Sequence, residues 1–166
     1  MNKTETLNKI INRFSFEDNE TTENLRAIDD GKAAASDDTV ADFRSLNAED
    51  GLTAEEIEAI NASTDEEIRS ALTEYFKNFV DEQIDDEKYN IREAVSDWFD
   101  GHCHSDDFDS EYQRQQYFRD LIDGNGDSDY ICDEVIDEIE YQFLTDDEAL
   151  NLIDEAIVDE ASYWAD

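Results

Sequence analysis

The last stretch of the chain, residues 120–166, restricts the fold most, because helical apolar spacing is combined there with uninterrupted negative charge. It contains seventeen Asp and Glu and no Lys or Arg. Its apolar residues recur every three or four positions: Val135, Ile136, Ile139 and Phe143, then Leu150, Ile153, Ile157 and Trp164. This spacing predicts helices with one apolar and one acidic face. Because like charges three or four residues apart repel on a helix, the pattern costs stability and indicates that the charge is useful.

The composition combines enough apolar residues for a folded core with a net charge that makes the chain repel itself. The 166 residues carry a net charge of −36, which approaches the composition of disordered chains. Nine Phe, seven Tyr and two Trp can supply a core. The regular apolar spacing therefore predicts one folded domain, with or without a small appendage, whose stability rises with salt.

The same charge restricts the partners and the location. Direct binding to DNA, RNA or an anionic membrane is disfavoured by repulsion, so the expected partners are basic surfaces or cations. No apolar stretch is long enough to span a bilayer, and residues 1–14 lack the continuous apolar run of a signal peptide. The two cysteines, Cys103 and Cys132, are expected to be reduced and buried. A cytoplasmic protein is predicted.

The chain has no proline and five glycines, so little interrupts the periodic segments. Ser or Thr followed three residues later by Glu predicts capping boxes at residues 53–56, 63–66 and 145–148. Helices are predicted over about residues 4–14, 22–35, 38–46, 53–60, 63–80, 89–99, 110–122, 129–144 and from 145 onward. The fold class is therefore all-α, a compact helical domain of about six to eight helices with strongly acidic outer faces.

Charge and periodicity divide the chain unevenly. Residues 1–80 have 8 Lys and Arg against 19 Asp and Glu, whereas residues 81–166 have 4 against 29. The weaker periodicity of residues 1–50 predicts a small N-terminal helical subdomain or an oligomerisation arm. Residues 51–166 are predicted to form the main acidic helical domain.

One turn between predicted helices, residues 123–134, resembles the twelve-residue calcium loop of an EF-hand. Side-chain oxygens stand at the ligand positions of that loop, and the candidate metal ligands are Asp123, Asn125, Asp127, Asp129 and Glu134. Ser128 replaces the glycine of the family, Tyr130 replaces its β-branched residue, and no second loop appears. The alternatives are thus a calcium site and a plain acidic turn.

Other chemistry finds little support in the sequence. The run His102-Cys103-His104 with Cys132 lacks the ligand spacing of structural zinc sites and is expected to be an ordinary loop. The chain has no glycine-rich phosphate loop and no Gly-x-Ser-x-Gly elbow. Carboxylates are so numerous that no acid–base pair stands out. A non-enzymatic protein is predicted.

The acidic faces are the remaining candidate site. Asp133, Asp137 and Glu140 are expected to form a row on a helix, and residues 81–87 and 106–109 form dense acidic clusters. The carboxylates predicted to bind a partner are Asp81, Asp85, Asp86, Asp106, Asp107, Asp109, Asp133, Asp137, Glu138, Glu140, Asp147, Asp154 and Glu155. Because DNA also presents negative charge in regular rows, such carboxylates could occupy a cleft lined with Lys and Arg.

In size, charge and helical architecture the chain is similar to the DNA-mimic inhibitors of phages and mobile elements, such as antirestriction and anti-CRISPR proteins. The resemblance implies a protein, frequently dimeric, that blocks a DNA-handling defence enzyme by occupying its nucleic-acid cleft. A homodimer would lengthen the acidic surface toward a DNA-like span. Alternative hypotheses are a single-loop calcium-binding protein, an acidic protein adapted to high salt, and an acidic chaperone for a basic protein such as a histone.

Overall fold

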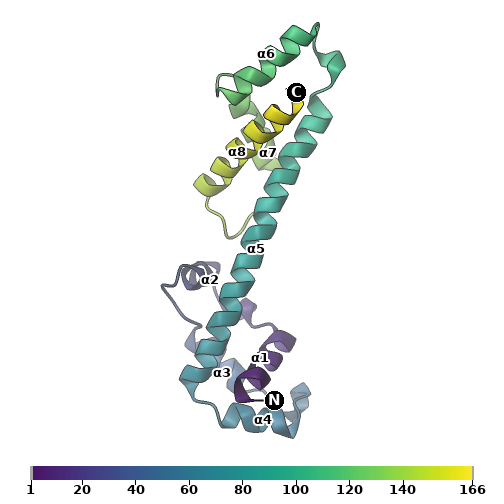
Figure 1. The fold of residues 1–166 in the computed structure, drawn as a ribbon. Helices are drawn as coiled ribbons and strands as arrows, with labels where there is room; N and C mark the ends of the chain where they lie inside the picture. Colours follow the sequence, from purple (N-terminus) through teal and green to yellow (C-terminus); the bar gives the residue numbers. More distant parts are fainter. Residues whose placement is uncertain (1, 166) are drawn as a thin grey trace. The chain divides into compact units, whose positions relative to one another are not determined.

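Eight α-helices, three short 3₁₀ helices and no strand make up residues 2–165, the part of the chain that the computed structural model describes (Figure 1). The prediction of an all-α fold is confirmed. None of the helices in these residues is both long enough and apolar enough to cross a membrane. The elements are α1 (Lys3–Phe14), η1 (Glu17–Asn19), α2 (Thr22–Asp29), α3 (Asp37–Arg44), η2 (Ala48–Asp50), α4 (Ala54–Asn61), α5 (Asp65–His102), η3 (Ser105–Asp107), α6 (Glu111–Ile122), α7 (Ser128–Glu138) and α8 (Asp146–Trp164).

The chain divides into two compact units, unit 1 (residues 1–83) and unit 2 (residues 84–166). The boundary lies inside α5, which contributes 19 residues to each unit. Residues 1–50 lie in unit 1 with α4 and the first half of α5, because α1 packs against α4 and the α3 region bonds to α5. The division thus falls near residue 83, whereas the sequence placed a boundary near residue 50.

Two of the predicted capping boxes begin helices where expected. At the start of α4, the Thr53 hydroxyl accepts from the Glu56 N–H at 3.1 Å, and the Glu56 carboxylate accepts from the Thr53 N–H at 2.9 Å. Thr145 and Glu148 make the same two bonds at the start of α8, at 3.2 and 3.1 Å. These bonds satisfy N–H groups that have no partner within the helix.

The third capping box, predicted at residues 63–66, is shifted by one residue. Thr64 and Glu67 form it, with bonds of 3.1 and 3.3 Å between each side chain and the other residue's N–H. The Ser63 hydroxyl instead donates to the Ala59 carbonyl at 2.7 Å. The sequence contains two overlapping Ser/Thr-x-x-Glu patterns, one beginning at Ser63 and one at Thr64. Because the Ser63 hydroxyl is bonded to the preceding turn, the Thr64 hydroxyl forms the cap.

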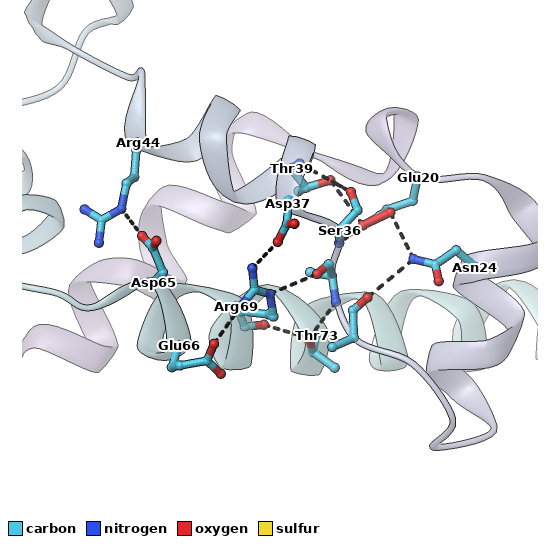
Figure 2. Close-up of polar contacts among 12 residues, drawn as sticks. Glu20, Asn24, Ser36, Asp37, Thr39, Arg44, Asp65, Glu66, Arg69 and Thr73 are labelled. Atoms are coloured by element: carbon cyan, nitrogen blue, oxygen red, sulfur yellow. Dashed lines mark hydrogen bonds and ion pairs between the residues drawn. The ribbon is translucent and has the colours of Figure 1, made fainter.

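Polar contacts around Arg69 bind the α3 region to α5 in unit 1 (Figure 2). Its guanidinium donates to Asp37 at 2.5 Å, to Glu66 at 2.7 Å and to the Ala35 carbonyl at 3.2 Å. Figure 2 also shows Glu20 accepting from the Ser36 N–H, the Thr39 hydroxyl and the Asn24 amide. The charged side chains of Arg69 and Glu20 therefore have partners within unit 1.

Helix α2 ends at Asp29, whereas the sequence predicted a helix as far as residue 35. Gly31 has a φ of +76°, the left-handed conformation that glycine adopts readily. The Gly31 N–H donates to the Ile28 carbonyl at 3.0 Å and the Lys32 N–H to the Ala27 carbonyl at 2.8 Å. These two bonds form a Schellman cap, which closes the helix.

Helix α5 is one helix of 38 residues, whereas the sequence predicted two helices over residues 63–80 and 89–99. Ile84, Glu87 and Ile91 continue its buried side at spacings of three and four residues. The acidic Glu87 at an apolar position explains the predicted gap. Gly101, the expected stop, lies inside the last turn, and the helix ends at His102.

Helix α7 ends at Glu138, six residues before the predicted end. The following residue, Ile139, is extended (φ −103°, ψ 145°). The N–H groups of Gln142 and Phe143 donate to the Glu87 carboxylate instead of to carbonyls of a helix. Glu140 therefore does not extend a helical row.

Helix α8 packs on α6 and α7 in unit 2, as the yellow and green ribbons in Figure 1 show. Several buried side chains of unit 2, on α5 to α8, are aromatic or aliphatic. They are Phe99, Phe118, Leu121, Ile131, Val135, Ile153 and Ile157. The opposite sides of these helices carry polar residues together with exposed apolar ones, among them Tyr112 on α6, Tyr130 on α7 and Tyr163 on α8.

Candidate partner-binding surface

The thirteen carboxylates predicted to bind a partner are all exposed. Twelve lie in unit 2, and Asp81 lies in the unit 1 part of α5. Within residues 2–165, none of the thirteen lies within 4.0 Å of a Lys or Arg nitrogen. Each is therefore open to a cation from outside the chain.

Three of these carboxylates also have contacts within the fold. Asp107 accepts from the His104 N–H at 2.9 Å and caps η3. Asp154 accepts from the Cys132 thiol at 3.1 Å. Asp81 hydrogen-bonds to Asp29, and burial together with this bond raises the pKa of Asp29 to about 6. The other ten are better candidates for contact with a partner.

Glu87 does not belong to the acidic cluster predicted at residues 81–87. Its side chain is buried, with 9% exposed, and its carboxylate accepts from the N–H groups of Gln142 and Phe143, the latter at 2.9 Å. A buried carboxylate is tolerable when such bonds replace its hydration. Glu87 thus holds the loop between α7 and α8 against α5 and takes no part in a surface.

One groove of unit 2 gathers several carboxylates. Its volume is about 440 Å³, and its lining residues are Asn90, Glu93, Ala94, Asp97, Glu138, Ile139 and Glu140. The four lining residues from α5 follow one another at i, i+3, i+4 and i+7, so they share one side of the helix. The end of α7 and the residue pair after it supply the opposite wall. We call this feature the acidic groove.

Four carboxylates and no Lys or Arg line the acidic groove. Within the described chain these four carboxylates make no ion pair with a Lys or Arg. Like charges held close together raise the free energy of the unliganded state, and a cation placed among them lowers it. The groove is therefore suited to a cationic side chain.

The sequence had predicted two of these carboxylates, Glu138 and Glu140, but missed Glu93 and Asp97. Their signal was present: with Asn90, they follow a helical spacing on the side opposite Ile91 and Val95. A helical-wheel comparison of residues 89–99 with residues 129–140 could have paired the two acidic sides. Nothing in the sequence indicated that both sides border one groove.

The candidate calcium loop contains a helix cap. Gly124 has a φ of +77°, and its N–H donates to the Leu121 carbonyl at 3.2 Å. The Asn125 N–H donates to the Asp120 carbonyl at 2.7 Å, which completes a Schellman cap on α6. Helix α7 then begins at Ser128, so the later candidate ligands lie on a helix.

The structure does not bring Glu134 together with Asp123, Asn125 and Asp127. Its carboxylate accepts from the Trp98 indole N–H at 2.6 Å and from the Tyr130 hydroxyl at 2.8 Å. The Trp98 bond, then the Tyr130 bond, lower the pKa of Glu134. Among residues 2–165, no group of three or more His, Cys, Asp or Glu is arranged to hold a metal ion.

The two cysteines are free and buried. Burial raises the pKa of the Cys103 thiol to about 11, and burial with the Asp154 bond raises that of Cys132 to about 12. Both thiols are therefore protonated at neutral pH, and neither is a ready nucleophile or metal ligand. The structure therefore gives no indication that Cys103 or Cys132 acts as a nucleophile.

Comparisons of the chain with models of known protein families, with curated proteins and with solved structures found no match. Most of the exposed carboxylates predicted to bind a partner lie in unit 2, where the acidic groove is formed by α5 and the end of α7.

Proposed function

We propose that this chain is an inhibitor that occupies the basic nucleic-acid-binding cleft of a DNA-handling protein, as DNA-mimic inhibitors of restriction or CRISPR enzymes do. The observation that carries the proposal is the set of exposed carboxylates without Lys or Arg partners, four of which border the acidic groove. Carboxylates fixed on helices complement a cleft lined with Lys and Arg. The mechanism is competitive occlusion, because the inhibitor and DNA require the same cations.

The affinity in this mechanism is distributed over many contacts. One exposed ion pair contributes about 0.2–1 kcal/mol, so no single carboxylate is expected to dominate. Long-range attraction between the acidic unit and a basic cleft speeds association at low ionic strength. Inhibition should accordingly weaken as salt rises, and one neutralised acid should have a small effect.

The test compares two variants with equal change in charge. In the unit 2 variant, five acids are replaced by their amides: Asp133, Asp137, Glu138, Glu140 and Asp147. In the matched unit 1 variant, five exposed acids are replaced likewise: Glu23, Asp42, Glu49, Glu55 and Glu58. Each variant has a net charge of −31 instead of −36, because five negative charges are removed.

Each protein is used to capture partners from a bacterial lysate, and the captured DNA-binding protein is assayed for duplex binding. We expect the wild type and the unit 1 variant to displace DNA, and the unit 2 variant to do so at least about tenfold less well. Equal loss in both variants would show that net charge alone matters and would overturn a site in unit 2. A chain that folds only in molar salt and displaces no DNA would favour salt adaptation instead.

A further inference from the structure

Unit 2 exposes large apolar side chains, and in residues 2–83 none is comparably exposed. The exposed residues are Tyr89, Tyr112, Ile122, Tyr130, Leu150, Val158 and Tyr163. Tyrosine is frequent among residues that dominate protein–protein contacts, because it buries a large rigid surface at low entropic cost. Tyr89 has a particular position: it is 61% exposed and precedes Asn90, a residue of the acidic groove.

Tyr89 shares a helix side with the acidic groove. Asp86, Tyr89, Glu93 and Asp97 follow one another on α5 at spacings of three and four residues, and all four are exposed. Such neighbours have Cβ atoms about 5–6 Å apart. Tyr89 therefore lies one helical turn from Glu93, a carboxylate that lines the groove.

We propose that this side of α5 binds an arginine side chain of a basic protein partner, with the guanidinium held between the groove carboxylates and the ring of Tyr89. The inference rests on the proposed function for the basic character of the partner and adds which cation is recognised. A guanidinium is planar, bonds carboxylates in a two-pronged manner and stacks on aromatic faces, whereas an ammonium is a compact, strongly hydrated charge.

The chain itself shows this stacking elsewhere. The Arg13 guanidinium lies 5.1 Å from the centre of the Phe14 ring, and that of Arg114 lies 5.6 Å from the Phe118 ring. No such contact occurs at Tyr89 in the described part of the chain. Lys88 and Arg92 are the cations nearest to Tyr89 in the sequence, and within residues 2–165 neither lies over its ring. A cation from a partner can thus reach the ring.

Charge complementarity selects the occupant. Unit 2 has 4 Lys and Arg against 27 Asp and Glu, so a second copy of the chain would bring like charge against this side of α5. Nucleic acid would be repelled for the same reason. An arginine-bearing protein surface supplies the opposite charge and a planar group that matches the ring.

The test measures binding of labelled ten-residue arginine and lysine peptides to the full chain by fluorescence polarisation at 0.15 M salt. We expect the wild type to bind the arginine peptide about threefold more tightly than the lysine peptide, the size expected of an exposed cation–π contact. Tyr89→Leu should remove this preference and leave lysine-peptide binding unchanged, whereas Tyr89→Phe should keep it. Tyr112→Leu, at a tyrosine that is 73% exposed on α6, is the matched control and should also keep it.

Equal binding of the two peptides by the wild type, or an unchanged preference in Tyr89→Leu, would overturn the inference. Binding of neither peptide would also overturn it. Failure of the proposed function gives a different result: the arginine preference and its loss in Tyr89→Leu would be observed, but the chain would displace no DNA from a captured partner. Self-association that competes with the peptides would assign this side of α5 to a second copy and overturn the inference.

Discussion

The two units use their carboxylates differently. Unit 1 has 8 Lys and Arg among 21 Asp and Glu, and in its described residues five of these bases bind carboxylates of the same unit: Lys3, Arg13, Arg26, Arg44 and Arg69. In unit 2, with 4 bases among 27 acids, Arg114 binds Glu111. These five bases pair with six carboxylates of unit 1, so ion pairs within the fold are more frequent in unit 1 than in unit 2.

Helix ends show the same difference. The last turns of α1, α2 and α3 contain Arg13, Arg26 and Arg44, where a cation is favoured by the helix dipole. The last turns of α7 and α8 contain no base. The last turn of α6 contains Arg119, however, and that of α4 in unit 1 contains no base, so this contact is more frequent in unit 1 without being confined to it.

The largest effect on the free energy of unfolding is expected at Glu87, because this acid of unit 2 is buried whereas most acids of the unit are exposed. Replacing Glu87 with Ala leaves the N–H groups of Gln142 and Phe143 without the carboxylate that they now bond, inside a buried region. We expect the free energy of unfolding to fall by about 2–4 kcal/mol, measured by urea denaturation. Glu82→Ala, at an exposed position of the same helix, should change it by less than about 0.5 kcal/mol. Equal effects would mean that Glu87 is an ordinary surface acid.

An intermediate effect is expected in unit 1, where Asp29 and Asp81 share a hydrogen bond. The pKa of Asp29 is raised from 3.8 to about 6, so the folded state holds a proton that the unfolded chain releases at lower pH. The stability from this proton is full below about pH 4 and is lost as the pH rises through about 6. Asp29→Asn should therefore stabilise the chain more at pH 8 than at pH 5.

The difference between the two pH values should be on the order of 1 kcal/mol, because solvent screens this partly exposed pair. Urea denaturation of the wild type and the variant at both pH values measures it. Asp42→Asn, at an exposed carboxylate of α3, provides the control and should show the same effect at pH 5 and pH 8. A pH-independent effect of Asp29→Asn would contradict the raised pKa.

The smallest effect on stability is expected from two exposed acids, one in the last turn of a helix of unit 2 and one in the first turn of a helix of unit 1. Asp137 lies in the last turn of α7 and one turn after Asp133, so the helix dipole and a like charge both oppose it. Asp137→Asn should stabilise the chain by about 0.3–0.5 kcal/mol. Glu23→Gln should destabilise it by a similar amount, because Glu23 lies in the favourable first turn of α2. Thermal unfolding measures both, and equal signs would contradict the comparison between the units.

Most of the fold could be predicted because periodicity and caps are local signals. The ends of α1, α3 and α6 lie within about two residues of the predicted ends. At α5 and α7 the prediction was wrong because a distant group decided the local structure. Glu87 is an acid at a core position of α5, and only the N–H groups of Gln142 and Phe143, 55 and 56 residues later, make its burial tolerable. The same bonds end α7 early.

The site was predicted less completely than the fold. Exposure of the nine acids that lie on α5, α7 and α8 follows from helical spacing, because apolar residues mark the opposite side. The acidic groove depends on how α5 packs beside the end of α7, which no local pattern encodes, so Glu93 and Asp97 were missed. The acidic turn after α6 shows the reverse error: its composition resembles a metal loop, whereas its hydrogen bonds form a helix cap.

The contact between Glu87 and the loop that follows α7 also has a consequence for synthesis of the chain. Gln142 is added 55 residues after Glu87, an interval of about three to ten seconds at ordinary rates of translation. Until then the Glu87 carboxylate has neither of these two N–H partners, and the second half of α5 lacks the loop that covers it. All residues of unit 1 have been synthesised by then. Unit 1 can therefore fold while unit 2 is still emerging from the ribosome.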